Sequence, residues 1–230
     1  MTTIRLGLLL LATACKPAPA AEPQPVIEDV ETSDPTPART DTVRPPLAED
    51  LATYTKDLPG TRALEARIET PVGTLNCELF ADKAPLTVAN FVGLATGKKA
   101  WLDPGTQEVV RGKTFYDGLI FHRVIPGFMI QGGDPEGNGS GGPGYRFDDE
   151  IAGLPMEPGT LAMANAGPKT NGSQFFIMEG SRPDLASKHT IFGKCNELDV
   201  VTKIANAPAE NDRPQTAVTM RVRISRRAIP

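Results

Sequence analysis

An arginine and a glutamine stand among large apolar residues in the stretch from Phe121 to Asp134, which reads FHRVIPGFMIQGGD. In a plain core strand Arg123 and Gln131 would be costly, because a buried charge or amide without a partner loses its hydration. A second stretch, 161–177, reads LAMANAGPKTNGSQFFI and again mixes amide side chains with aromatic ones. We therefore take the two stretches together as a candidate functional surface.

With a third stretch, 188–194 (KHTIFGK), these motifs resemble the cyclophilin family, in the same order and over roughly 64–224. Several long motifs in order are far more specific than one short match. The resemblance implies a mainly β fold, a closed eight-stranded antiparallel β-barrel capped by two α-helices. It also implies peptidyl-prolyl cis-trans isomerase activity, with no cofactor.

The resemblance implies that ten residues line the active groove. Each of them is of the residue type that the family has at that position. Arg123 is the catalytic candidate. The substrate-binding candidates are Phe128, Met129, Gln131, Ala164, Asn165, Gln174, Phe176, Leu185 and His189.

Rotation about an X-Pro peptide bond moves no proton and no electron, but it must break the amide resonance, a barrier of ~18–20 kcal/mol. A guanidinium fixed near the proline nitrogen donates to it only as the bond twists, so it binds the transition state selectively. We expect Arg123 to be that donor, held rigidly and away from water. Gln131 would hold the guanidinium or a substrate carbonyl, and backbone groups near Ala164 and Asn165 would pair with an extended peptide.

An apolar pocket for the proline ring is the second requirement. Its expected members are Phe128, Met129, Phe176 and Leu185. Taken singly, an aromatic residue in a β domain is more often part of the core, so the two phenylalanines are candidates mainly through the resemblance.

Other chemistries have less support. His122 should face away from Arg123 as a satisfied structural histidine. The two histidines and the two cysteines that remain after Cys15 are spread far apart in the sequence, so a metal site is not expected. The stretch 137–142 fits a dinucleotide fingerprint by letter, but that fingerprint needs a strand before it and a helix after it, and here Pro143 and 145–147 (YRF) follow. Asp148, Asp149 and Glu150 are interpreted as a solvated acidic turn.

The composition limits the partners. The chain has 230 residues, 40% of them hydrophobic, and a formal net charge of only -4. It can build a core but has no broad basic surface, so nucleic acid is not an expected partner. The expected partners are proline-containing peptides and unfolded or exported proteins, bound by a monomer.

The first residues indicate export. An apolar run follows Arg5 and ends in small residues before Cys15, which predicts a signal peptide over 1–14 and lipidation at Cys15. A simple cleaved signal peptide is the alternative. Residues 15–46, with eight prolines, predict a disordered tether. The expected location is the bacterial cell envelope, facing the periplasm and anchored to a membrane by lipid.

The remaining elements follow from periodicity. Residues 47–63 predict a short helix and linker, and 64–226 the isomerase domain. Alternation around Pro71–Gly73 predicts a hairpin, and apolar spacing predicts helices after Pro85 and after Leu198. Residues 98–113 are interpreted as an inserted loop.

Two points concern single positions. Cys77 alternates with Leu75 and Leu79, so a buried apolar thiol is favoured over a disulfide with Cys195, which export would permit. Asp184 stands where human-type relatives have a tryptophan that helps to bind cyclosporin, which predicts weak inhibition by that drug. A peptide-binding chaperone or scaffold without catalysis is the alternative function.

Overall fold

The computed structural model describes residues 42–58, 60 and 62–227. The expected signal peptide, Cys15 and most of the tether lie outside these residues. The described end of the tether contacts the domain: Lys99 Nζ donates to the carbonyl of Arg44 at 2.8 Å, and Arg44 forms an ion pair with Asp50 at 2.7 Å. Arg44 is thus held against the domain, although the sequence analysis included it in the tether 15–46. Within the described ranges, no helix is long and apolar enough to cross a membrane.

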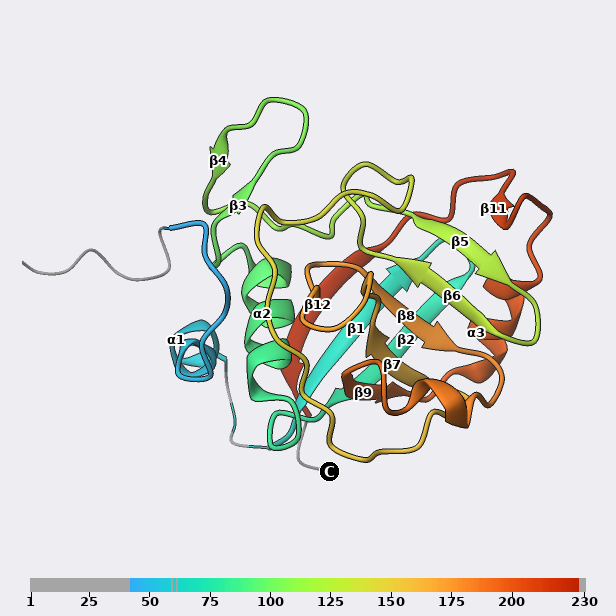
Figure 1. Ribbon diagram of the computed structural model, residues 1–230, viewed down its shortest axis with the longest axis horizontal. Coiled ribbons are helices and arrows are strands. Elements are labelled where there is room, and N and C mark those ends of the chain that lie inside the picture. The colour runs from blue at the N-terminus through green and yellow to red at the C-terminus, as the bar shows by residue number, and fades with distance from the viewer. Residues whose placement is uncertain (1–41, 59, 61, 228–230) are drawn as a thin grey trace, which may run out of the picture. The chain divides into compact units, whose positions relative to one another are not determined.

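Eight antiparallel strands form one sheet in the order β12-β1-β2-β9-β7-β8-β6-β5 (Figure 1). Their bounds are β1 (Leu64–Thr70), β2 (Gly73–Leu79), β5 (Phe121–Ile125), β6 (Met129–Gly132), β7 (Thr160–Met163), β8 (Phe175–Met178), β9 (Ile191–Cys195) and β12 (Arg221–Arg226). The predicted hairpin is β1–β2, in which Thr70 pairs with Gly73. A mainly β fold built on an eight-stranded antiparallel sheet is confirmed.

The closure of the barrel is only partial. The edge strands β5 and β12 share no continuous ladder, and their approach runs through one bridge, between Ile120 and Thr219. Backbone hydrogen bonds flank that bridge, from Phe121 N to the Val218 carbonyl and from Met220 N to the Leu119 carbonyl. The sheet is therefore a strongly curled one that meets itself at a single seam, rather than the fully closed barrel that was expected.

Two helices lie on opposite sides of the curled sheet, α2 (Pro85–Thr96) and α3 (Leu198–Ala205) (Figure 1). Pro85 occupies the first turn of α2, and Gly97 ends the helix with a left-handed φ of 71°. Both helices were predicted from their apolar spacing. A third, short helix, α1 (Asp50–Thr55), lies within the range 47–63 and packs beside α2, with Tyr54 fully buried.

The stretch 98–113 contains more structure than a loop. Strands β3 (Trp101–Leu102) and β4 (Val109–Val110) pair as a small separate hairpin. Trp101 packs locally, as expected, with its ring edge-on to Phe115 at 5.0 Å between centroids.

The cysteines correct one expectation. Cys77 on β2 and Cys195 on β9 stand opposite one another in the ladder, and a disulfide joins them. Both are buried, as the alternation around Cys77 indicates, but the unpaired thiol favoured from the sequence is wrong. Partners 118 residues apart become neighbours only through the sheet, which local periodicity does not reveal.

Candidate active site

The outer face of the sheet carries an apolar cluster where a plain barrel would be polar. Along β8, Phe175 points into the core, whereas Phe176 points outward. The outer apolar cluster consists of buried Met129, Met156, Ala162, Phe176, Met178 and Ile191. Phe128, Ala164 and Leu185 are half-buried and pack at its edge. All four residues expected to receive a proline ring therefore belong to one cluster.

A row of opposed residues connects this cluster to the polar candidates. Arg123 on β5 is the ladder partner of Gln131 on β6, which in turn stands opposite Phe176 on β8 and then Ala162 on β7. Opposed side chains on one face of a sheet are neighbours about 5 Å apart. The row thus runs from a charged side chain through an amide to an aromatic ring, so Arg123 and Phe176 can act on one bound residue.

The environment of Arg123 differs from the expectation. Its side chain is 45% exposed rather than withdrawn from water, and Nε donates to Asp212 Oδ2 at 3.3 Å. It lines an open cleft of about 810 Å³, together with Gln131, Asn165 and His122. Arg123 thus has access to a cleft, as the proposed chemistry requires, but its side chain is not withdrawn from water.

The amide side chains of Gln131 and Gln174 form a chain of hydrogen bonds beside the cleft. Gln131 donates through Nε2 to Gln174 Oε1 at 3.0 Å, and among the described residues its Oε1 accepts no hydrogen bond from the Arg123 guanidinium. Gln174 in turn donates to the carbonyls of Gly139 and Gly141 at 3.0 and 2.9 Å. Gln174 therefore ties β8 to the glycine-rich loop and fixes the orientation of Gln131.

Residues 164 and 165 offer backbone groups at the rim. The Ala164 N–H is used internally, by the Gln174 carbonyl at 3.0 Å. The Ala164 carbonyl and the Asn165 N–H have no hydrogen-bond partner among the described residues. The two groups belong to one trans peptide unit and point in opposite directions, so an extended peptide in the groove can pair with one of them.

The two histidines differ in their surroundings. His189 Nδ1 lies 3.0 Å from the Met163 carbonyl, and its ring stands edge-on to Phe176 at 5.2 Å, at the groove's edge as expected. His122 is buried, but neither ring nitrogen has a hydrogen-bond partner among the described residues, so it is not the satisfied histidine that was expected. Burial lowers the pKa of both imidazoles.

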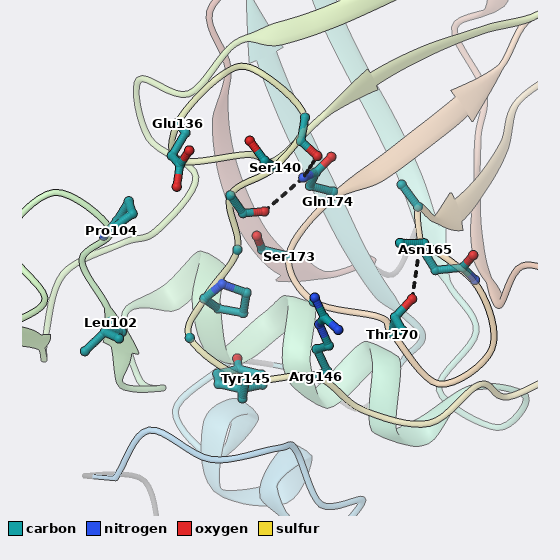
Figure 2. A pocket seen from close by; sticks show the side chains of 18 of the residues that line it. Leu102, Pro104, Glu136, Ser140, Tyr145, Arg146, Asn165, Thr170, Ser173 and Gln174 are labelled. Carbon is teal, nitrogen blue, oxygen red and sulfur yellow. Dashed lines mark hydrogen bonds between the residues drawn. The ribbon is translucent and has the colours of Figure 1, made fainter.

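A second cavity, of about 450 Å³, adjoins the cleft, since Gln131 and Asn165 line both. Figure 2 shows Asn165 and Thr170 on one side of it and Ser140 and Glu136 on the other. Leu102 and Pro104, on or just after β3, belong to its lining (Figure 2). The sequence analysis assigned no function to the insertion 98–113, and it interpreted the glycine-rich loop as a turn-forming segment rather than a dinucleotide site.

Two further residues were missed by the sequence analysis. Asp212, the partner of Arg123, lies in a polar turn 89 residues away. Glu150 is no solvated turn residue but binds the start of α2 through Leu86 N and Thr87 N. No spacing signal in the sequence links either carboxylate to its partner.

Nothing in the described ranges gathers three or more metal-binding side chains. The candidate site thus consists of the outer apolar cluster, the Arg123 guanidinium and the backbone groups at residues 164 and 165.

A family model described as cyclophilin type peptidyl-prolyl cis-trans isomerase/CLD matches residues 65–225. The chain belongs to this family. Peptidyl-prolyl cis-trans isomerase A of Mycobacterium tuberculosis is 52% identical over 163 residues, covering 67% of this chain and 88% of that protein. Peptidyl-prolyl cis-trans isomerase B of Streptomyces anulatus is 50% identical over 159 residues, covering 66% and 90%.

Solved cyclophilins agree with this assignment. A crystal structure of a Cryptosporidium parvum cyclophilin type peptidyl-prolyl cis-trans isomerase matches with a TM-score of 0.62 at 35% identity, covering 73% of this chain and 99% of that one. Its counterpart in the presence of the dipeptide Ala-Pro gives a TM-score of 0.60. This cyclophilin therefore belongs to an enzyme family, and its fold is that of the family.

The structure also shows the surroundings of Asp184, which stands where human-type cyclophilins have a tryptophan. Asp184 lies in the 3-10 turn η2 (Pro183–Leu185) and pairs with Arg182 at 2.9 Å. The Arg182 guanidinium stands 5.0 Å from the centroid of the Phe128 ring. A charged pair thus occupies the rim of the cyclophilin groove beside Phe128.

Proposed function

We propose that this chain accelerates cis-trans isomerisation of X-Pro bonds in exported proteins, with Arg123 as the donor to the twisting amide. The observation that carries the proposal is the row Arg123, Gln131, Phe176, which joins an apolar cluster to an accessible guanidinium on one face. A proline ring seated on Phe176 brings its nitrogen toward the Arg123 side of the row. The Ala-Pro dipeptide of the Cryptosporidium parvum structure is a ligand of the matching kind.

The peptide would be held by its backbone. Either the Ala164 carbonyl or the Asn165 N–H, which point in opposite directions from one peptide unit, would form a hydrogen bond with the peptide, on the side of the groove away from Arg123. When the residues on both sides of the X-Pro bond are held, part of the binding free energy can favour the twisted transition state over the planar ground state.

The donor then acts during rotation. The proline nitrogen gains a lone pair as the amide twists, and the Nη groups of Arg123 can donate to it, because only Nε is bound to Asp212. A preorganised donor contributes about 3–4 kcal/mol, or about two to three decades in rate. Because Arg123 is partly solvated, the bound peptide must exclude water for this value to be reached.

The decisive experiment is a protease-free refolding assay on a protein whose slow phase is a prolyl isomerisation. We expect catalytic amounts of the chain to accelerate that phase. Peptide binding measured by titration without any acceleration would support the alternative, a non-catalytic proline-peptide-binding chaperone or scaffold.

The location is part of the proposal. We propose that Cys15 is lipidated and that the domain acts in the bacterial cell envelope, facing the periplasm. The signal pattern before Cys15 supports export, and so does the Cys77–Cys195 disulfide, since disulfides persist in oxidising compartments. Metabolic labelling with palmitate should mark the wild-type chain and leave Cys15→Ser unlabelled.

A further inference from the structure

A tight turn places a carboxylate beside the proposed catalytic arginine. Strands β10 (Ala209–Glu210) and β11 (Arg213–Pro214) pair as a hairpin whose two-residue turn is Asn211-Asp212. Both turn residues have positive φ, 50° and 65°. Two-residue hairpins need this conformation, and asparagine and aspartate tolerate it better than other non-glycine residues.

The turn is fixed onto β5 by its backbone. Val124 N donates to the Asp212 carbonyl at 2.7 Å, so the residue after Arg123 anchors the residue that faces it. Arg213 Nη1 donates to the Gly137 carbonyl at 2.5 Å, which ties the hairpin to the glycine-rich loop as well. The position of the Asp212 carboxylate is therefore set by two neighbouring segments and not by the ion pair itself.

The ion pair is poorly suited to a purely stabilising role. Arg123 and Asp212 are 45% and 46% exposed, and exposed pairs contribute little to folding because water screens them. The contact uses Nε alone, and Nε to Asp212 is the only hydrogen bond of this guanidinium among the described residues. Binding by Nε leaves Nη1 and Nη2 without a hydrogen-bond partner among the described residues, so both remain available as donors.

We propose that Asp212 is a positioning residue for Arg123. It holds the guanidinium by Nε, beside Gln131, so that the unbonded Nη groups are available to donate to the X-Pro nitrogen. A long side chain exposed at the cleft would otherwise sample many rotamers, few of which reach the substrate. This inference rests on the proposed function, because it assigns Asp212 a task only if Arg123 acts in catalysis.

The test compares kcat and KM by NMR exchange measurements on an Ala-Pro-containing peptide. Asp212→Asn keeps the size of the side chain and removes its charge. We expect kcat to fall about five- to tenfold, with KM changed by less than about twofold and an unaltered thermal unfolding midpoint. Asp212→Glu, which keeps the carboxylate, should recover at least about half of the lost kcat.

Two control variants separate positioning from charge. Glu210→Gln removes the same charge from the same hairpin but no contact to Arg123, so its loss of kcat should be clearly smaller. Asp199→Asn breaks an exposed pair with Lys203 on α3 and should behave as wild type. Equal losses of kcat for Asp212→Asn and Glu210→Gln would overturn the proposal, because the change in the electrostatic potential of the hairpin would then explain both losses.

A double variant provides the strictest check. If Asp212 acts through Arg123, adding Asp212→Asn to Arg123→Ala should cause no further loss of kcat. Additive losses, or an unchanged kcat in Asp212→Asn alone, would overturn the inference while leaving the isomerase function intact. A wild-type chain without any turnover would instead remove the proposed function itself.

Discussion

Glu150 Oε2 accepts hydrogen bonds from both the backbone N–H and the hydroxyl of Thr87, each at 2.8 Å. Its other oxygen accepts from Leu86 N at 2.9 Å. Helix α2 starts after Ala84, whose side chain cannot cap it, so a carboxylate more than sixty residues away satisfies the first N–H groups.

Replacing Glu150 should therefore destabilise the fold. We expect Glu150→Ala to lower the free energy of unfolding by about 1–2 kcal/mol in urea titrations, since two helix N–H groups lose their acceptor. Asp148→Ala is the matched control, because its exposed pair with Lys169 should contribute less than about 0.5 kcal/mol. Similar values for both variants would contradict the capping role.

The disulfide should contribute to stability through the unfolded state. Cys77 and Cys195 close a loop with a sequence separation of 118, and opening it should cost about 2–5 kcal/mol. Urea titrations with and without a phosphine reductant measure this difference, and alkylation of the unfolded chain checks the thiol count. In the Cys77→Ala/Cys195→Ala variant the reductant should have no effect on the midpoint.

Arg123→Ala should separate activity from folding. We expect kcat/KM in the refolding assay to fall by about two to three decades, because the donor to the proline nitrogen is lost. The unfolding midpoint should hardly change, since the one ion pair that Arg123 forms among the described residues is half exposed. Arg123→Lys retains the charge without the planar fork and should stay far below wild type. Full activity in Arg123→Ala would remove the mechanism.

Stability should depend on pH through the histidines. The sequence contains only two, His122 and His189, and burial lowers the pKa of both in the folded state. The unfolded chain then binds protons more readily, so the folded state is favoured above the unfolded pKa of about 6.5. This stability is lost as the pH falls through the lowered folded values.

Urea titrations at about pH 7.5 and about pH 5.5 measure this loss. His122→Phe should reduce the difference between the two, because Phe fills the buried site without a titrating group. A pH difference unaffected by His122→Phe would indicate that His189 or the carboxylates carry it.

Cyclosporin should inhibit weakly. The position where human-type cyclophilins have a tryptophan is Asp184, paired here with Arg182 beside Phe128. Asp184→Trp should strengthen inhibition by about tenfold or more, because it replaces a solvated carboxylate with a large apolar surface. Refolding assays over a range of drug concentrations measure both values, and tight inhibition of the wild type would contradict the prediction.

The sequence predicted those features of the fold that depend on the alternation of side chains and on residues close together in the chain. The inward and outward residues of β1 and β2 follow from period two, and the end of α2 follows from Gly97. The candidate groove residues came from the resemblance, and the structure brings them to one face.

The contacts that the sequence could not predict all join distant segments. The Cys77–Cys195 pairing, the Glu150 cap and the Arg123–Asp212 contact depend on which strands and turns become neighbours. A carboxylate in a polar turn looks like any solvated acid until its partner is known. The exposure of Arg123 likewise depends on the hairpin that covers it, and that hairpin has no motif.

The opposite orientations of Phe175 and Phe176 couple folding quality to activity. Because successive side chains of β8 serve the core and the groove, a slip of this strand by one residue would exchange the two rings. Such a molecule would lose its interior packing and its substrate surface in the same event. Inactive molecules in a preparation should therefore also be the ones that unfold early, and specific activity should serve as a measure of native folding.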